Sequence, residues 1–215
     1  MPRSALIVAT LAVFACGSPA EEDSASLCTA DRDPRPWLCN DRARVDLLSV
    51  APLARAFVGP APLVRVGHRP GMDLNGRAPS WSLTFVVDGG LTELMVSADG
   101  NVGERAVEGE LVCDPVGLEP VDSVLAVRAA VRRYEDSEGP FAVGPDTSLL
   151  LIQSDGCFLW NDEPVGDARR VRIAQPGASW FAELDAAGNV REWLGPCARD
   201  ARIGECREDA GRSIR

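Results

Sequence analysis

The sequence predicts an α+β domain in which antiparallel β-meanders pack on one or two helices and disulfides staple the fold. Three observations predict this class. Several segments alternate apolar and polar residues with the period of two that is typical of a half-buried strand. One segment has the apolar spacing of an amphipathic helix. Finally, seven cysteines are spread along a chain of 215 residues, a usage typical of oxidising compartments.

The first 15 residues predict an export signal. Arg3 supplies one positive charge, and residues 5–15 follow it without a charged side chain. This run is shorter than the roughly 20 apolar residues of a membrane-spanning helix, but it has the length of a signal-peptide core. Residues 16–30 are small, polar and acidic, so we expect them to form a flexible tether ahead of the globular region.

A small residue, Ala15, precedes Cys16 at the end of the apolar run. In this respect the first 17 residues resemble a bacterial lipoprotein precursor, although Val13 and Phe14 depart from the commonest residues of its lipobox. The resemblance implies that Cys16 is lipidated with acyl chains such as palmitate, becomes the mature N-terminus and anchors the chain to a lipid bilayer. Because Gly17 is not the aspartate that commonly retains such proteins at the inner membrane, it also implies the outer membrane of a bacterial cell envelope.

The cysteine count favours lipidation, because acylation of Cys16 leaves an even set of six cysteines that can pair fully. Proximity along the chain favours a local pair between the first two of these and another between the last two. Ordinary signal cleavage after Ala15 or Ala20 is the alternative and predicts a soluble secreted or periplasmic protein. Cleavage after Ala20 would also leave six cysteines. The six disulfide candidates are Cys28, Cys39, Cys113, Cys157, Cys197 and Cys206.

The charge balance narrows the classes of partner. The chain has 22 basic and 32 acidic residues, so a mature chain without Arg3 has a net charge of about -11. This acidity argues against nucleic acid and against electrostatic binding to anionic lipid. All 22 basic residues are arginine, which excludes P-loop, Schiff-base and Ser-x-x-Lys chemistry.

The globular region, residues 31–196, contains two halves at about 39–114 and 120–196. In the first half, residues 41–51 predict a short helix that Pro52 should end or kink. Alternation and turn residues then predict a series of strands joined in a meander. The three strands of the meander are expected at residues 81–88, 91–97 and 107–113, and one short strand precedes them at residues 63–67.

The second half opens with the clearest helix, residues 123–134, which Asp122 can cap. Its apolar face is Val124, Val127, Val131 and Tyr134. Residues 149–153 and 157–161 then predict a β-hairpin. A further meander is expected at residues 170–174, 179–184 and 189–194, followed by a charged tail at 197–215.

The two halves share a weak sequence similarity. Residues 97–104 align with residues 185–192 around a common Gly-Asn-Val, and each half places a helix before its strands. One interpretation is two related units, and the alternative is that Gly-Asn-Val is simply a common hairpin-turn sequence. The helix-then-meander order is similar to tandem PepSY-type units, an extracytoplasmic family linked to restraint of peptidases.

Catalytic motifs are scarce. His68 is the only histidine, and the arginines flanking it would lower its pKa if they lie close. Gly-x-Ser-x-Gly, Cys-x-x-Cys and calcium-loop patterns are absent from the sequence, so no catalytic residue, metal or cofactor is predicted. Carboxylate pairs such as Glu183 with Asp185, or Asp162 with Glu163, are candidates for a hydrolase, but they have the pattern of solvated strand edges or turns.

Four tryptophans on predicted strands are the remaining candidates for a binding surface. They would either stack on a sugar or peptide or form part of the core. The first functional hypothesis is therefore a noncatalytic, exported lipoprotein that binds an envelope protein or glycan. A carboxylate-dependent hydrolase and a peptidase-inhibitor-like module are the alternatives. The four tryptophans are Trp81, Trp160, Trp180 and Trp193.

Overall fold

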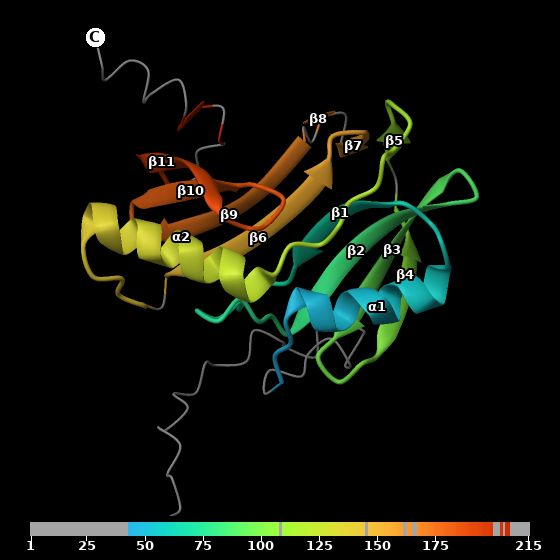
Figure 1. Cartoon of the computed structure of the whole chain (residues 1–215), viewed down its shortest axis with the longest axis horizontal. Coiled ribbons are helices and arrows are strands. Elements are labelled where there is room, and N and C mark those ends of the chain that lie inside the picture. The colour runs from blue at the N-terminus through green and yellow to red at the C-terminus, as the bar shows by residue number, and fades with distance from the viewer. Residues whose placement is uncertain are drawn as a thin grey trace, which may run out of the picture.

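The computed structural model describes residues 43–107, 109–144, 146–160, 163–164, 167–199, 203 and 205–206. In these residues, two helices lie on one face of a large antiparallel sheet (Figure 1). The predicted α+β class is therefore confirmed. Across the same residues, no helix has the length and apolar character needed to cross a membrane.

The element order repeats in the two halves of the chain. The first half contains one helix and four consecutive strands: α1 (Leu47–Val58), β1 (Leu63–His68), β2 (Ser80–Val87), β3 (Gly90–Ser97) and β4 (Val102–Ala106). The second half has the same order: α2 (Ser123–Glu138), β6 (Ser148–Asp155), β9 (Asp167–Gln175), β10 (Ala178–Leu184) and β11 (Val190–Ala198). Three short strands form a separate sheet in the order β5-β7-β8: β5 (Glu110–Leu111), β7 (Phe158–Trp160) and β8 (Glu163–Pro164).

The two halves share one eight-stranded sheet, with the strand order β11-β10-β9-β6-β1-β2-β3-β4. They join at its centre, where β1 pairs antiparallel with β6 and Val66 lies opposite Gln153. Every pairing in the large sheet is antiparallel. The central pairing makes the halves a continuous layer with one main hydrophobic core.

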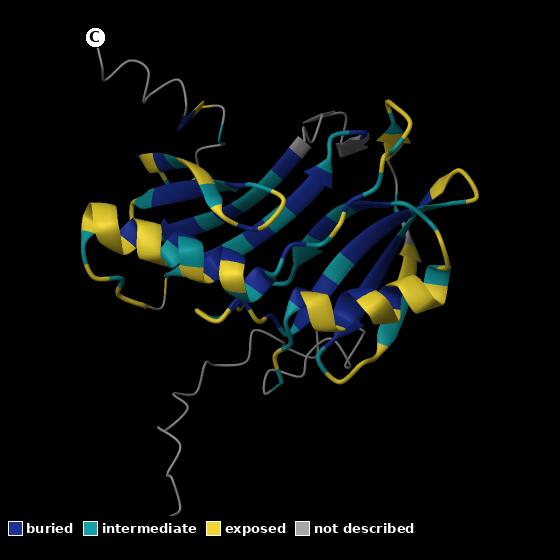
Figure 2. Cartoon of the chain, viewed as in Figure 1, coloured by how far each residue is buried: buried dark blue, intermediate teal, exposed yellow. Residues whose placement is uncertain are grey.

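Alternation along the strands gives the sheet a covered face and an open face. On the covered face, Leu83 pairs with Leu94 and Leu151 with Val171, and all four side chains are fully buried beneath the helices. Figure 2 shows this burial along the middle of the strands. The intervening residues point to the opposite face, which neither α1 nor α2 covers (Figure 1).

Helix α1 begins later than the sequence predicted and continues through Pro52 to Val58. Its N-cap is Asp46, whose carboxylate accepts a hydrogen bond from the Ser49 amide at 2.9 Å. Proline removes the hydrogen bond to the carbonyl four residues earlier, here that of Leu48, which is exposed. Because water can solvate that carbonyl and the opposite side of the helix is buried, the helix tolerates Pro52.

Helix α2 begins where the sequence predicted and ends one turn later. The Asp122 carboxylate caps it by accepting hydrogen bonds from the amides of Val124 and Leu125 at 2.9 and 3.1 Å. Its buried face includes Val127 and Tyr134. The helices are also joined directly, because the buried Ser123 hydroxyl accepts a hydrogen bond from the Leu47 amide at 3.0 Å.

Two strand predictions were wrong. The third strand of the first meander is residues 102–106, not 107–113. The sequence did not indicate this strand because β4 lies at the edge of the sheet and its Gly-Glu-Arg centre lacks the apolar alternation of a half-buried strand. Residues 149–161 do not form a hairpin either. Strand β6 pairs with β1 and β9, whereas β7 pairs with β5 and β8. One partner of β6 therefore comes from the first half of the chain, and the other, β9, lies further along its own half. The final meander is confirmed as β9, β10 and β11.

Two disulfides lie within the described residues. Cys113–Cys157 links the segment after β5 to the loop between β6 and β7, with Cα atoms 5.0 Å apart. Cys197–Cys206 closes the predicted local loop. The remaining predicted pair, Cys28 with Cys39, and the lipidation candidate Cys16 lie outside the described residues.

Candidate functional site

A charged pocket of about 290 Å³ lies on the open face over the first half of the sheet. Antiparallel pairing brings together four residues in one row: Arg65 on β1, Thr84 on β2, Glu93 on β3 and Arg105 on β4. All of them point away from the helices. The pocket is lined by Arg65, Gly67, His68, Arg69, Pro70, Ser82, Glu93, Met95 and Arg105.

Glu93 is the buried centre of this pocket, with a side chain only 6% exposed. The Ser82 hydroxyl donates a hydrogen bond to one carboxylate oxygen, and the Arg105 guanidinium donates to the other. A buried carboxylate needs such partners because leaving water costs it several kcal/mol. Thr84, opposite Glu93, has a buried hydroxyl without a hydrogen-bond partner among the described residues.

Two arginines of the row face a single carboxylate. Burial lowers the pKa of Arg65, the charge of Glu93 raises it, and the charge of Arg105 lowers it again. The charges of Arg65 and Arg105 therefore repel one another, while the Glu93 carboxylate attracts Arg65 and pairs with Arg105. An additional anionic group in the pocket would stabilise both guanidinium groups, so the arrangement favours binding of an anion.

His68 is a structural residue at the edge of the pocket. Its Nε2 accepts a hydrogen bond from the Leu151 amide at 3.0 Å, so Nδ1 carries the proton and donates a hydrogen bond to the Arg69 carbonyl at 2.6 Å. The ring also packs edge to face on Trp81, with centroids 5.3 Å apart. Burial lowers the pKa of His68 to about 4; the expected direction is therefore correct, but its main cause is burial rather than the flanking arginines.

The carboxylate pairs suggested for a hydrolase have other partners. Glu183 on β10 forms an ion pair with Arg170 on β9 at 3.4 Å. Asp185 accepts hydrogen bonds from the amides of Ala187 and Asn189, both at 2.9 Å, and these bonds shape the turn before β11. Neither carboxylate has a feature that marks a catalytic acid. Asp162 lies outside the described residues, as does the side chain of Glu163.

The tryptophans proposed as a binding surface lie mostly in the hydrophobic core, as far as their side chains are described. Trp81 is fully buried and donates its indole hydrogen bond to the Val45 carbonyl at 2.8 Å. Trp180 is 6% exposed and packs edge to face on Tyr134, while Trp193 is partly buried against the same core. Trp81 and Trp180 therefore cannot stack on a ligand, and the side chain of Trp160 is not among those described.

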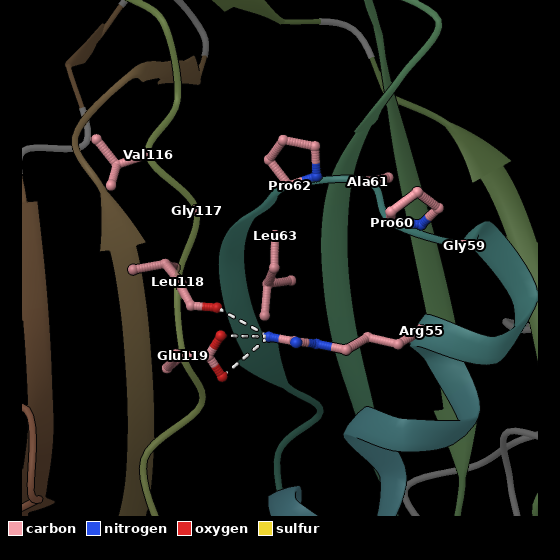
Figure 3. A pocket seen from close by; sticks show the side chains of 10 residues that line it. All are labelled: Arg55, Gly59, Pro60, Ala61, Pro62, Leu63, Val116, Gly117, Leu118 and Glu119. Carbon is pink, nitrogen blue, oxygen red and sulfur yellow. Dashed lines mark hydrogen bonds and ion pairs between the residues drawn. The ribbon is translucent and has the colours of Figure 1, made fainter.

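A second pocket, of about 430 Å³, lies between the end of α1 and the connection that leads to α2. Figure 3 shows Arg55 reaching across it from α1 toward Glu119. The Arg55 guanidinium lies 3.0 and 3.1 Å from the two carboxylate oxygens of Glu119. The charges of Arg55 and Glu119 neutralise each other, and the other lining residues are apolar or glycine. This pocket therefore has fewer charged groups with which to bind a ligand than the first pocket.

The described residues contain no group of three or more histidine, cysteine, aspartate or glutamate side chains arranged to hold a metal ion. In comparisons with known proteins, no family model, curated protein or solved structure matches the chain. The site is therefore assigned from its own geometry.

The sequence did not single out the row of Arg65, Thr84, Glu93 and Arg105. Each residue occupies a position that strand alternation assigns to the solvent face. Only the pairing of four strands shows that these positions are adjacent. The one available signal was a glutamate within the mainly apolar strand of residues 91–97.

Proposed function

We propose that this chain is an exported lipoprotein, anchored through Cys16, that binds an anionic ligand without catalysis in the pocket formed by β1–β4. The observation that carries the proposal is the row of two arginines around one buried glutamate. Arg65, Arg69 and Arg105 line this pocket, and a carboxylate group on an envelope peptide or glycan matches the geometry of a guanidinium group.

Two features support export and anchoring. The described residues contain two disulfides, which persist mainly in oxidising compartments. The N-terminal run ending at Cys16 resembles a lipoprotein signal. Together they favour a bacterial cell envelope, with the outer membrane preferred over the inner because Gly17 follows the cysteine.

Metabolic labelling with a fatty acid tests the anchor. The wild-type protein should incorporate label, and Cys16→Ser should not, because the substitution removes the thiol that is acylated. A wild-type protein without label would refute anchoring and would favour the soluble secreted or periplasmic alternative.

Titration with citrate, a soluble polycarboxylate, tests the pocket. Citrate should bind the wild-type protein, and Arg65→Gln should bind about tenfold more weakly because a charge-assisted hydrogen bond contributes roughly 1.5–3 kcal/mol. The control is Arg132→Gln, which removes an exposed arginine on α2 and leaves the pocket intact.

Chemical shift changes in the amides of β1–β4 would locate the binding site. Equal affinity of the two variants, or no binding by the wild type at about 10 mM citrate, would refute the anion site. A titration with glucose separates binding of the negative charge from binding of a sugar ring. An anion site should bind citrate and not glucose, whereas a site for a neutral sugar ring would bind glucose at least as well as citrate.

A further inference from the structure

Helix α1 exposes an apolar surface on the side that faces away from the sheet. Three large side chains are about half exposed: Leu48 and Leu53 at 45% and Phe57 at 54%. Pro52 and Ala56 lie between them on the same side and are also exposed. In Figure 2 the outer side of α1 is coloured as exposed along much of its length. The helix is thus apolar on its buried and exposed sides alike, which is unusual for a surface helix.

Helix α2 provides an internal comparison, because it occupies the equivalent place in the second half of the fold (Figure 1). Its exposed residues include six charged side chains, all in the stretch from Arg128 to Glu138. Leu125 is the large apolar residue exposed on it, at 55%. The fold therefore does not require an uncharged outer helix surface, and the apolar character of α1 needs its own explanation.

The charges near α1 also set it apart. The chain has 32 acidic residues and a net charge of -10, yet α1 contains no aspartate or glutamate. Its one charged residue, Arg55, lies at the flank and pairs with Glu119. An anionic lipid surface would be repelled by most of this protein, and least by the outer side of α1.

We propose that the outer side of α1, formed by Leu48, Pro52, Leu53, Ala56 and Phe57, rests among the lipid headgroups of the membrane that holds the anchor. The strength of such binding scales with the apolar area buried in the membrane and with electrostatic attraction to anionic lipid, and in this acidic chain the apolar area supplies it. The inference rests on the proposed function, because acylation of Cys16 brings α1 to the membrane.

The position of α1 in the chain favours lipid as its partner. It is the first described helix after the anchor, and 30 residues separate Cys16 from Leu47. The flexible tether expected at residues 16–30 has an average reach of roughly 20 Å. The membrane is therefore present at high effective concentration, so even a small apolar surface can remain in contact with it.

Photolabelling of the acylated, full-length mature protein in phosphatidylethanolamine–phosphatidylglycerol vesicles tests this contact. The vesicles carry a phospholipid with a diazirine in its acyl chain, and the protein is reduced and digested with trypsin after irradiation. Because all 22 basic residues are arginine, α1 falls in the peptides 45–55 and 56–65. These two peptides should carry the label, and peptide 134–169 from α2 onward should carry little.

Two variants distinguish specific contact of α1 with lipid from labelling by random collision with the vesicles. The double variant Leu53→Glu with Phe57→Glu should lower labelling of peptides 45–55 and 56–65 about tenfold, because it places two charges in the contact. Leu125→Glu on α2, a residue of matching exposure, should leave that labelling unchanged. Circular dichroism and denaturant unfolding confirm that both variants are folded before labelling.

The outcomes separate this inference from the proposed function. Acylated protein whose α1 peptides carry no more label than peptide 134–169 would overturn the lipid contact but leave the anchor intact. Unlabelled α1 together with a dimer in analytical ultracentrifugation would overturn it in favour of a second copy on the same surface. Protein without an acyl chain at Cys16 would refute the anchor. In that case the same photolabelling with added vesicles still tests α1, and unlabelled peptides would refute its lipid contact as well.

Discussion

Lowering the pH from 7 to 5 should destabilise the folded protein through His68. Burial lowers the pKa of this histidine from 6.5 to about 4 in the folded state. Between these values the unfolded chain binds more protons than the folded one, so the free energy of unfolding falls as the pH decreases. The two pKa values correspond to a loss of about 2 kcal/mol by pH 5 and about 3 kcal/mol by pH 4.

The physical reason is the hydrogen bonding of the ring. Protonation at Nε2 would place a second N–H against the Leu151 amide, which now donates to that nitrogen. The guanidinium groups of Arg65 and Arg69 line the same pocket and would repel an added positive charge on the ring. The folded structure therefore has no favourable place for the imidazolium.

Urea unfolding followed by tryptophan fluorescence measures the effect, with His68→Gln as the reference because it removes the titrating group. The stability advantage of the wild type over His68→Gln should shrink by about 2 kcal/mol between pH 7 and pH 5. Because His68 is the only histidine, proton NMR of untagged protein also follows its titration without ambiguity. An equal pH dependence in the two proteins, or a folded-state midpoint near 6.5, would refute this account of the ring.

Three further predictions concern stability, and denaturant unfolding checks each of them. Arg105→Gln should cost about 2 kcal/mol, less than the roughly 3–5 kcal/mol for breaking a fully buried pair, because Arg105 is half exposed and Glu93 keeps its Ser82 hydrogen bond and the nearby charge of Arg65; a neutral effect would show that the pair is not formed. Gly76→Ala should cost far more than Gly100→Ala, since both have positive φ but only a Cβ at Gly76 would collide with the backbone of α2. Backbone strain alone, at Gly100, should cost about 1 kcal/mol. Replacing both Cys113 and Cys157 by serine opens a loop with a sequence separation of 44 and should cost about 4 kcal/mol; an unchanged midpoint would argue that the disulfide is absent.

Strands bounded by local signals could be predicted from the sequence. Strands β3, β10 and β11 each follow a turn that contains a glycine with positive φ, and one side of each strand packs on the core. The start of α2 was equally accessible, because Asp122 both precedes the helix and caps it. In these segments the residues that define the element are neighbours in the chain.

Helix α1 shows where local signals mislead. The sequence favoured residues 41–51 because proline ordinarily ends a helix. In the structure Leu47, Val50 and Ala54 are buried on the sheet, and Ser123 of α2 accepts a hydrogen bond from the Leu47 amide. Contacts with distant parts of the chain thus outweigh the cost of Pro52, and no local pattern contains that information.

Composition, an apolar N-terminal run and strand alternation were enough to predict a disulfide-containing α+β protein, because each depends on residues close in sequence. The central pairing of β1 with β6 and the row from Arg65 to Arg105 depend instead on strands brought together from separate parts of the chain. Glu93 illustrates the difference. Alternation places it on the face away from the core, where a glutamate is ordinarily hydrated. It is buried because Ser82 and Arg105, from the strands on either side, take the place of water around its carboxylate.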